Sequence, residues 1–279
     1  FGLFCKRSFI NEIESVTLGD VTCGIGNVIH NKGAIGAFVQ MKARSLPKKQ
    51  FGKESKRSKS LKLLFITAHM AAHVKNVEAR NMDYWRIASE LEAQAPEHFL
   101  PLKQVSSDDN DENNEGTGSY LMDHVDRIFF CGDLNYRLDL PREIAEASIA
   151  SMKRLSSEKN DSEEVEKLRL DLLLHDQLLN AMSQGTAFPG FAEGRITFMP
   201  TFKFDKGTND YDTSHKQRIP AWTDRILFKP EGTRVLEYKS EERCIHSDHR
   251  PVHATFRINT LGRLLKSTRR RSQKSRVKK

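Results

Sequence analysis

The sequence predicts a single mixed domain of the α/β or α+β class. Short apolar runs that suit buried strands alternate irregularly with segments of helical periodicity, and no internal repeat is found. The length of 279 residues suits one large domain or at most two small ones. A hydrophobic fraction of 38% with 29% charged residues is typical of a soluble globular chain that carries loop insertions.

The first expected elements are a strand and a helix. Residues 61–68 (LKLLFITA) form an apolar run that predicts a buried strand, and residues 82–95 have the periodicity of a helix. That periodicity places five apolar side chains on one face: Tyr84, Ile87, Ala88, Leu91 and Ala95. We expect this face to be buried against the rest of the domain.

The remaining elements continue the same mixture. Residues 125–131 (VDRIFFC) predict a second strand, and two helical segments follow at 141–152 and 162–182. The second of these carries Glu163, Glu164 and Glu166 near its start, where the helix dipole favours acidic side chains. Short apolar runs at 224–228 (DRILF) and 252–258 (VHATFRI) predict two further strands.

Several protein classes are excluded by composition. No apolar run approaches the roughly 18 residues that a membrane span needs. The first residues, FGLFCKR, lack the charged-then-apolar pattern of a secretion signal. The four cysteines lie far apart with no C-x-x-C spacing, which argues against a zinc ribbon or a disulfide framework and favours a reducing compartment. We therefore expect a cytoplasmic protein.

Two biased segments interrupt the domain, and a third follows it. Residues 42–62 hold nine Lys and Arg against one Glu54, and residues 106–118 read SSDDNDENNEGTG. Neither could bury enough apolar area to offset its ordering entropy, so we expect poorly ordered insertions at about 44–60 and 104–118. The domain itself is expected to cover residues 1–261.

The third segment is a basic tail at 262–279, which we expect to be disordered. Nine Lys and Arg and no acidic residue lie in 263–279, so most of the net charge of +8 belongs to the tail. The remainder carries 36 basic and 37 acidic residues. Such a tail suits an anionic membrane surface, nucleic acid or a nuclear import receptor, and the alternative is a simply solvated end. Peripheral membrane association is therefore expected, and a nuclear location is also compatible with the tail.

Polar side chains capable of phosphate chemistry follow or precede the expected strands. They are His69 after the first strand, Asp133 and Asn135 after the second, Asp224 at the start of the third, and Asp248 and His249 before the fourth. Loops at strand ends are the usual position of a catalytic constellation. Carboxylates, an amide and imidazoles suit the Mg²⁺-assisted attack of water on a phosphate.

Two longer motifs relate this pattern of polar residues to a known family. FCGDLNYR at 130–137 and RIPAWTDRIL at 218–227 closely resemble the two signatures of the inositol polyphosphate 5-phosphatases. Shorter matching words occur in family order: NKG at 31–33, TAHMAAH at 67–73, PTFKF at 200–204 and SDHRP at 247–251. The family belongs to the endonuclease/exonuclease/phosphatase superfamily. The resemblance implies a two-sheet β-sandwich flanked by helices, the four-layer DNase-I-like architecture.

The resemblance also implies roles for the matching residues. Asp133 would orient or deprotonate the attacking water, with Asn135 contacting water or phosphate beside it. Asp224 would fix the tautomer of His249, whose imidazole would meet the scissile phosphate together with His69. These five residues are the expected catalytic set.

Other matching residues are expected to bind the metal or the substrate. Asp248 would support Mg²⁺ or the attacking water. Lys203, Lys216 and Arg218 resemble the contacts of the family to a neighbouring 4-phosphate, because several phosphates need several cationic donors. Lys32 would meet another phosphate. Asn31, His73 and Arg225 are expected to support the same region.

Three features depart from the family pattern. Phe202 stands where some members have Tyr, so one hydroxyl contact is missing, and Cys131 stands where Trp is common. No counterpart of the family's Glu ligand of Mg²⁺ precedes Gly24, so the chain resembles a family member without its N-terminal strands.

The expected function is a Mg²⁺-dependent phosphatase that removes the 5-phosphate from phosphoinositides, such as phosphatidylinositol 4,5-bisphosphate, or from soluble inositol polyphosphates. The alternatives are a catalytically impaired module that binds anions or membranes, and a nuclease of the same superfamily. We expect a monomer and no specific nucleic-acid partner.

Overall fold

The computed structural model describes residues 1–24, 32–42, 60–100, 120–158 and 162–259. The tail expected at 262–279 and the insertion expected at 104–118 lie outside these residues, as does the insertion at 44–60 apart from residue 60. The described strands are β1 (Ile13–Thr22), β2 (Gly33–Met41), β3 (Leu61–His69), β4 (Arg127–Asp133), β5 (Ala192–Glu193), β6 (Asp224–Phe228), β7 (Thr233–Ser240) and β8 (Val252–Ile258). The described α-helices are α1 (Val77–Ala93), α2 (Tyr120–His124), α3 (Arg142–Ser157), α4 (Ser162–Leu173) and α5 (Gln177–Gln184), and short 3₁₀ helices span Arg7–Glu12 and Glu97–Phe99.

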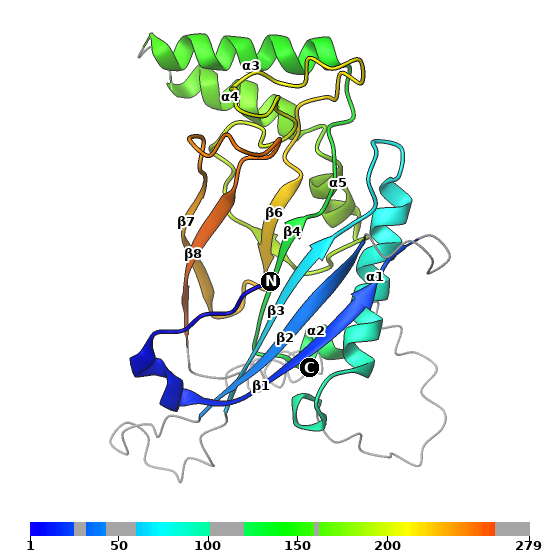
Figure 1. The fold of residues 1–279 in the computed structure, drawn as a ribbon, viewed down its shortest axis with the longest axis vertical. Helices are drawn as coiled ribbons and strands as arrows, with labels where there is room; N and C mark the ends of the chain where they lie inside the picture. The colour runs from blue at the N-terminus through cyan, green and yellow to red at the C-terminus, as the bar shows by residue number, and fades with distance from the viewer. Residues whose placement is uncertain (25–31, 43–59, 101–119, 159–161, 260–279) are drawn as a thin grey trace, which may run out of the picture.

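A six-stranded sheet in the order β1-β2-β3-β4-β6-β5 forms the centre of the fold. Its pairs are antiparallel except β3 and β4, which run parallel. Helix α1 lies between these two strands in the chain and covers one face of the sheet (Figure 1). A parallel pair needs such a crossover because both strands must start at the same edge.

The core between α1 and the sheet follows from the two side-chain periods. Four of the five residues expected on the apolar face of the helix are buried there: Tyr84, Ile87, Ala88 and Leu91. They pack against alternating positions of the strands, including Phe38, Leu64, Ile66 and Phe130. The helix prediction is thus confirmed, although the helix begins at Val77, five residues before the expected start.

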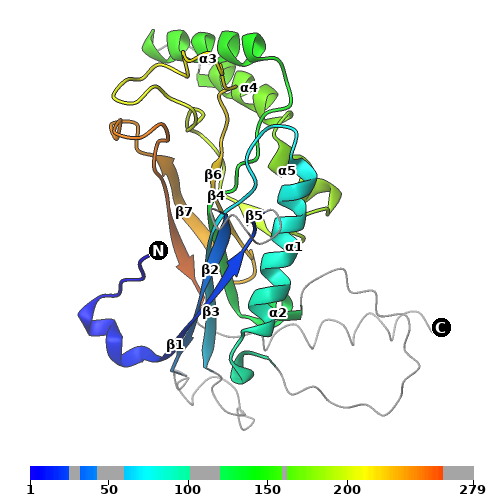
Figure 2. The same ribbon diagram turned by 45° about the vertical axis from the view of Figure 1, so that its right-hand side comes forward.

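A second, two-stranded sheet of β7 and β8 covers the opposite face (Figure 2). Phe256 of β8 packs on Phe129 and Phe228 of the larger sheet, with ring centroids 4.9 and 5.1 Å apart. Two sheets packed face to face and flanked by helices confirm the predicted fold class.

Helices α3 and α4 lie beyond one end of the large sheet (Figure 1). Their buried side chains, among them Ile149 and Met152, belong to one core cluster with Trp222. Trp222 is fully buried and donates from Nε1 to the carbonyl oxygen of Phe198 at 3.1 Å. The segment that leads into β6 is therefore anchored to the helices by packing and to the segment at Phe198 by a hydrogen bond.

One predicted helix is wrong in its extent. The segment 162–182 forms two helices, α4 and α5, because the chain breaks before Asp176. The Asp176 side chain accepts a hydrogen bond from the backbone N–H of Leu179 at 2.9 Å, which caps a new helix. The expected strands at 224–228 and 252–258 have their predicted bounds, and the other expected elements are present with shifted ends.

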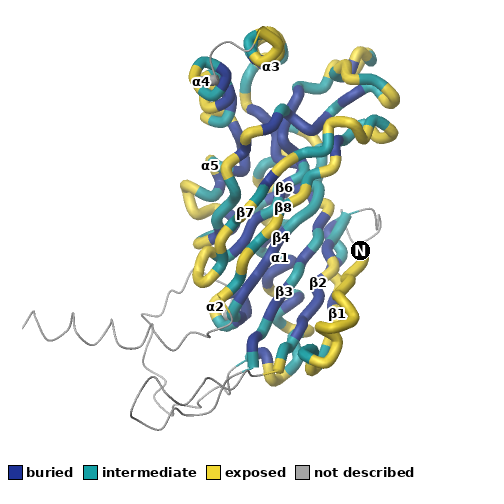
Figure 3. Tube along the Cα trace, turned by 90° about the vertical axis from the view of Figure 1, so that its left-hand side faces the viewer, coloured by how far each residue is buried: buried dark blue, intermediate teal, exposed yellow. Residues whose placement is uncertain are grey.

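Strands β1, β2, β5 and β7 were not predicted. β1 lies at the edge of the sheet, where Val16 and Leu18 are exposed, and Figure 3 shows this exposure along the strand. Its sequence therefore lacks the apolar run of a central strand. Within the described residues, no helix combines the length and apolar character of a membrane span.

Candidate active site

Three strands bring the predicted polar residues to one end of the large sheet. His69 ends β3 and is paired in register with Asp133, which ends β4. Asp133 is in turn paired with Asp224, the first residue of β6. His249 joins them from the loop before β8 through a bridge to Phe202. The structure therefore brings together four of the five residues expected to be catalytic, and the fifth, Asn135, lies two residues after Asp133.

His69 and Lys32 approach the Asp133 carboxylate. His69 Nε2 lies 3.2 Å from Asp133 Oδ2 and 2.5 Å from Lys32 Nζ, and its side chain is 51% exposed. Burial lowers the pKa of Lys32, although the Asp133 charge opposes this effect. A cation, an imidazole and a carboxylate are thus adjacent at the open end of β3 and β4.

The Asp133 carboxylate is held in its ionised form. Burial by itself would raise its pKa, but the hydrogen bond from His69 and the charges of His249 and Arg137 outweigh burial and lower the pKa. The carboxylate is therefore available to accept a proton or orient a water at neutral pH.

A glycine near the end of β4 precedes this carboxylate. Gly132 has a φ of +127°, and a Cβ at this position would lie 2.1 Å from the carbonyl oxygen of Ala68. No other residue fits such a close approach of two strands. Asp133 then accepts from the backbone N–H of Asn135 through Oδ1 at 3.1 Å.

Asn135 is 2% exposed, and its amide is used within the protein. Its Nδ2 donates to the carbonyl oxygen of Met70 at 3.0 Å and to Asp133 Oδ2 at 3.1 Å. Its Oδ1 accepts from Nη2 of Arg137. Asn135 therefore orients the Asp133 carboxylate, where the sequence led us to expect direct contact with water or phosphate.

Asp224 and His249 form a second pair. Asp224 Oδ2 lies 2.8 Å from His249 Nδ1 and accepts from the hydroxyl of Thr223 at 3.0 Å. Burial by itself would lower the pKa of His249, but the hydrogen bond and charge of Asp224, with the charges of Asp133 and Asp248, raise it. Phe202 packs against the imidazole, with ring centroids 4.7 Å apart.

The two pairs form one candidate cation site. Among the described residues, Asp133, Asp224 and His249 are the group whose potential ligand atoms all lie within 4.8 Å of one another. Two carboxylates suit Mg²⁺, which typically takes one or two protein carboxylates and completes its octahedron with waters and phosphate oxygens. The residues present therefore fit a hard divalent cation. Asp248, expected to support the metal, is not a member of this group.

The expected phosphate-binding residues lie on the segment before β6. Lys203 and Arg218 are half-buried, and Lys216 is exposed. Asp212 shapes this segment, because its Oδ2 accepts from the backbone N–H of Arg218 at 2.8 Å. The pKa of Arg137 is lowered to about 10, mainly by burial, and the nearby charge of Arg218 contributes to this lowering.

The side chain of Arg225 does not lie in a position from which it could contact substrate. Its guanidinium is 0% exposed and is bound by two carboxylates, Asp176 and Glu193. Despite its burial, the attraction of these two charges raises the pKa of Arg225 well above the usual value. The prediction of a substrate-binding role is wrong, because every polar atom of this side chain faces the protein interior.

The two remaining residues of the expected set are His73 and Asn31. The His73 side chain is exposed, and the backbone of His73 has a φ of +77° and accepts from Arg80 through its carbonyl oxygen. Asn31 lies outside the described residues. Sequence reasoning also missed the buried polar residues behind the site, notably Arg80, Arg137 and Gln177. Of these, only Arg137 carried a signal, because it ends the first signature.

Comparison with known proteins agrees with this geometry. The family model described as "Endonuclease/Exonuclease/phosphatase family 2" matches residues 1–255. Type II inositol 1,4,5-trisphosphate 5-phosphatase of Mus musculus is 32% identical over 251 residues, covering 90% of this chain and 20% of that protein. Phosphatidylinositol 4,5-bisphosphate 5-phosphatase INP51 of Saccharomyces cerevisiae is 35% identical over 256 residues, covering 91% of this chain and 21% of that protein.

A solved structure extends the comparison to the fold. The inositol polyphosphate 5-phosphatase domain of SpSynaptojanin, in complex with inositol (1,4)-bisphosphate and calcium, matches with a TM-score of 0.62 and 31% identity. The match covers 98% of this chain and 65% of that one. The chain spans about a fifth of the length of the two curated relatives above. The chain belongs to the endonuclease/exonuclease/phosphatase family 2, and it is similar to the inositol 5-phosphatases named above.

Proposed function

We propose that this chain is a Mg²⁺-dependent phosphatase that removes the 5-phosphate from phosphoinositides or soluble inositol polyphosphates. The observation that carries the proposal is the convergence of His69, Asp133 and the Asp224–His249 pair at one end of the sheet. The names of the two curated relatives, both 5-phosphatases, support the reaction and the substrate class.

In the proposed reaction, Asp133 orients the attacking water and takes its proton. The water oxygen forms a bond to phosphorus while the bond between phosphorus and the inositol oxygen breaks, and the released inositol oxygen takes a proton from solvent. Asp224 holds Nδ1 of His249, so Nε2 is the nitrogen that faces a phosphate oxygen. The raised pKa of His249 favours the protonated imidazole, which stabilises charge on the phosphoryl oxygens. His69 and Lys32 supply further donors at the same end of the sheet.

The cation would be held by Asp133 and Asp224. When bound, it would polarise a phosphoryl oxygen and neutralise part of the phosphate charge. The solved relative in complex with calcium and inositol (1,4)-bisphosphate supports a divalent metal at this site. We propose that this metal is Mg²⁺. Lys203, Lys216 and Arg218 would bind a neighbouring phosphate of the inositol ring.

Phosphate release from phosphatidylinositol 4,5-bisphosphate in the presence of Mg²⁺ tests the proposal. The chain, an Asp133→Ala variant and an Asp171→Ala control on the exposed surface of α4 are compared. We expect release by the chain and by the control, with a loss of at least about 100-fold in Asp133→Ala, because it lacks the proposed general base.

Two outcomes would replace the proposal. Binding of the lipid without phosphate release would favour the impaired anion-binding module. Cleavage of DNA or RNA, lost in Asp133→Ala, in the absence of phosphate release would favour the nuclease. In a separate assay, deleting 262–279 is expected to weaken binding to anionic liposomes at low salt, because each positive charge contributes on the order of 1 kcal/mol near the surface.

A further inference from the structure

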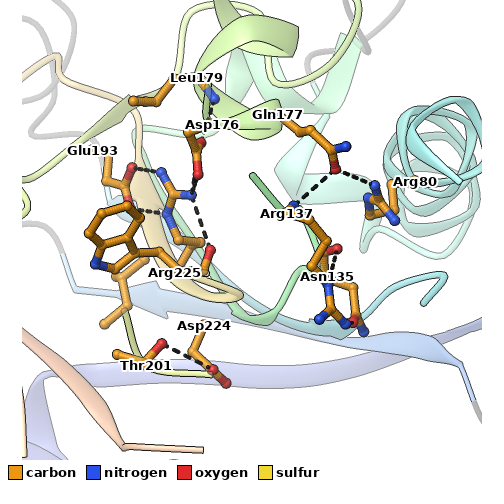
Figure 4. A network of polar contacts seen from close by, with 12 residues as sticks. Arg80, Asn135, Arg137, Asp176, Gln177, Leu179, Glu193, Thr201, Asp224 and Arg225 are labelled. Atoms are coloured by element: carbon orange, nitrogen blue, oxygen red, sulfur yellow. Dashed lines mark hydrogen bonds and ion pairs between the residues drawn. The ribbon is translucent and has the colours of Figure 1, made fainter. Parts of the chain in front are cut away.

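Asp176, the N-cap of α5, and Gln177, the first residue of α5, lie between the Asp224–Arg225 segment and the segments that follow β3 and β4 (Figure 4). Both are buried, and neither belongs to the two sequence signatures. Asp176 accepts from Nη1 of Arg225 through both carboxylate oxygens, at 3.0 and 2.9 Å. Because Arg225 follows Asp224 directly in β6, this contact ties α5 to the second signature.

Gln177 makes the contacts to the other half. Its Oε1 accepts two hydrogen bonds, from Nη2 of Arg80 at 2.7 Å and from the backbone N–H of Arg137 at 2.9 Å. Its Nε2 donates to the carbonyl oxygen of Val74 at 3.1 Å. Its backbone N–H donates to the carbonyl oxygen of Arg137 at 2.9 Å. One side chain therefore joins α1, the segment after β3 and the segment after β4.

The partners of Gln177 lead directly to the reacting groups. Arg80 donates from Nη1 to the carbonyl oxygens of Ala71 and His73, at 3.1 and 2.7 Å, and so holds the segment that follows His69. Arg137 donates to the backbone carbonyl oxygen of Asn135 at 3.1 Å and to its side-chain Oδ1. Asn135 in turn holds the Asp133 carboxylate.

We propose that Gln177 is a positioning residue that fixes His69 and Asp133 relative to the Asp224–His249 pair. This role rests on the proposed phosphatase function. An amide matches this position fully, because two donors converge on Oε1 while Nε2 meets a carbonyl oxygen. Leucine makes none of these bonds, and glutamate keeps the two acceptor bonds but loses the donation to Val74. Gln177 touches no reacting atom, so its loss is expected to affect catalysis more than substrate binding.

The test compares Gln177→Leu, Gln177→Glu and the control Gln184→Leu, which alters an exposed glutamine at the other end of the same helix. The activity readout is the steady-state release of phosphate from phosphatidylinositol 4,5-bisphosphate. For Gln177→Leu we expect kcat to fall at least about tenfold with KM within about twofold, because misplaced groups impair the transition state without removing phosphate contacts. Gln177→Glu should recover most of this loss, and Gln184→Leu should match the parent chain.

A second readout does not depend on activity. Amide hydrogen exchange is measured in segments 70–74 and 133–137, with β7–β8 as the internal reference. Gln177→Leu should exchange faster in both segments together and be unchanged in the reference. If Gln177→Leu does not fold, the exchange of Gln177→Glu tests the positioning role. In that variant we expect faster exchange at 70–74 only, because only the bond to Val74 is lost.

The outcomes separate the two proposals. A parent chain that releases no phosphate refutes the proposed function, while the exchange experiment still tests the positioning role. A parent chain that is active, with equal kcat in Gln177→Leu, refutes the positioning role alone. Unchanged exchange in both segments of Gln177→Leu also refutes the positioning role. A rise in KM with unchanged kcat refutes it too, because that result would make Gln177 a substrate-binding residue.

Discussion

Replacing Arg225 by methionine should destabilise the fold severely, and this distinguishes a structural arginine from a substrate-binding one. Arg225 donates to Glu193 from Nε at 2.7 Å and from Nη2 at 2.6 Å, in addition to its two contacts with Asp176. The side chain of Asp176 is 0% exposed, and that of Glu193 is 5% exposed. Methionine fills a similar volume but leaves both carboxylates without their cation.

The expected loss follows from this burial. Removing one partner of a buried ion pair typically costs about 3–5 kcal/mol, because a charge is left buried and uncompensated. Here one arginine balances two carboxylates, so we expect the upper part of that range. Whole domains are stable by only about 5–15 kcal/mol, so the variant should lie close to unfolding.

Urea unfolding followed by tryptophan fluorescence measures this free energy, with two comparison variants. Arg243→Met removes an arginine whose side chain is 91% exposed and pairs with Glu241, and such surface pairs contribute about 0–1 kcal/mol. Arg225→Met combined with Asp176→Asn and Glu193→Gln removes the unpaired charges, so it should regain much of the lost stability. Asparagine is also a good N-cap for α5.

The same variant has a characteristic pH dependence. Burial already raises the pKa of Asp176 although Arg225 opposes this effect, so the loss of the cation in Arg225→Met should raise the folded-state pKa of Asp176 further. A group with a raised folded-state pKa favours folding at pH values below its unfolded pKa, and this contribution is lost as the pH rises. The deficit relative to the parent chain should therefore be smaller at pH 4 than at pH 7. A loss below 1 kcal/mol with a raised KM would refute the structural role and restore the predicted substrate contact.

The remaining predictions concern the site itself. Chelation of divalent metal should abolish phosphate release, and added Mg²⁺ should restore it, as measured by a phosphate assay before and after dialysis. Lys216→Met should raise KM for phosphatidylinositol 4,5-bisphosphate about tenfold with little change in kcat or stability, because one exposed charge-assisted contact is lost; an unchanged KM would contradict its proposed contact. Asp224→Asn should lower the pKa of His249, because Asp224 raises that pKa in the parent chain. The alkaline limb of the pH profile of kcat/KM should therefore move to lower pH. If the limb does not move, it reports the titration of a group other than His249.

The part of the fold that the sequence predicts is the part with strong local patterns. Strand β6 was predicted with its observed bounds, and β3 lacked only its last residue, because their apolar runs end abruptly in polar residues. These polar ends also predicted the meeting of His69, Asp133 and Asp224, which the register of three neighbouring strands produces. A one-residue slip in register would turn these side chains to the other face.

The parts that were missed depend on tertiary contacts. Strand β1 exposes apolar side chains at the sheet edge, so no burial pattern marks it in the sequence. The break between α4 and α5 depends on Asp176, whose side chain caps one helix and binds an arginine 49 positions away. Nothing local in the segment 162–182 distinguishes this aspartate from a solvated one on a continuous helix.

The same reasoning explains why the supporting network escapes sequence analysis while the reacting groups do not. A reacting group must stand at a strand end beside a glycine or a turn, and that context is visible in a short motif such as FCGDLNYR. A group that positions it can come from any helix that passes behind the site. Arg80 and Gln177 are polar residues in amphipathic helices, where an exposed position is the ordinary expectation. Their burial shows that strand register alone does not fix the site, because register sets the backbone positions and buried hydrogen bonds set the orientations of the loops that follow.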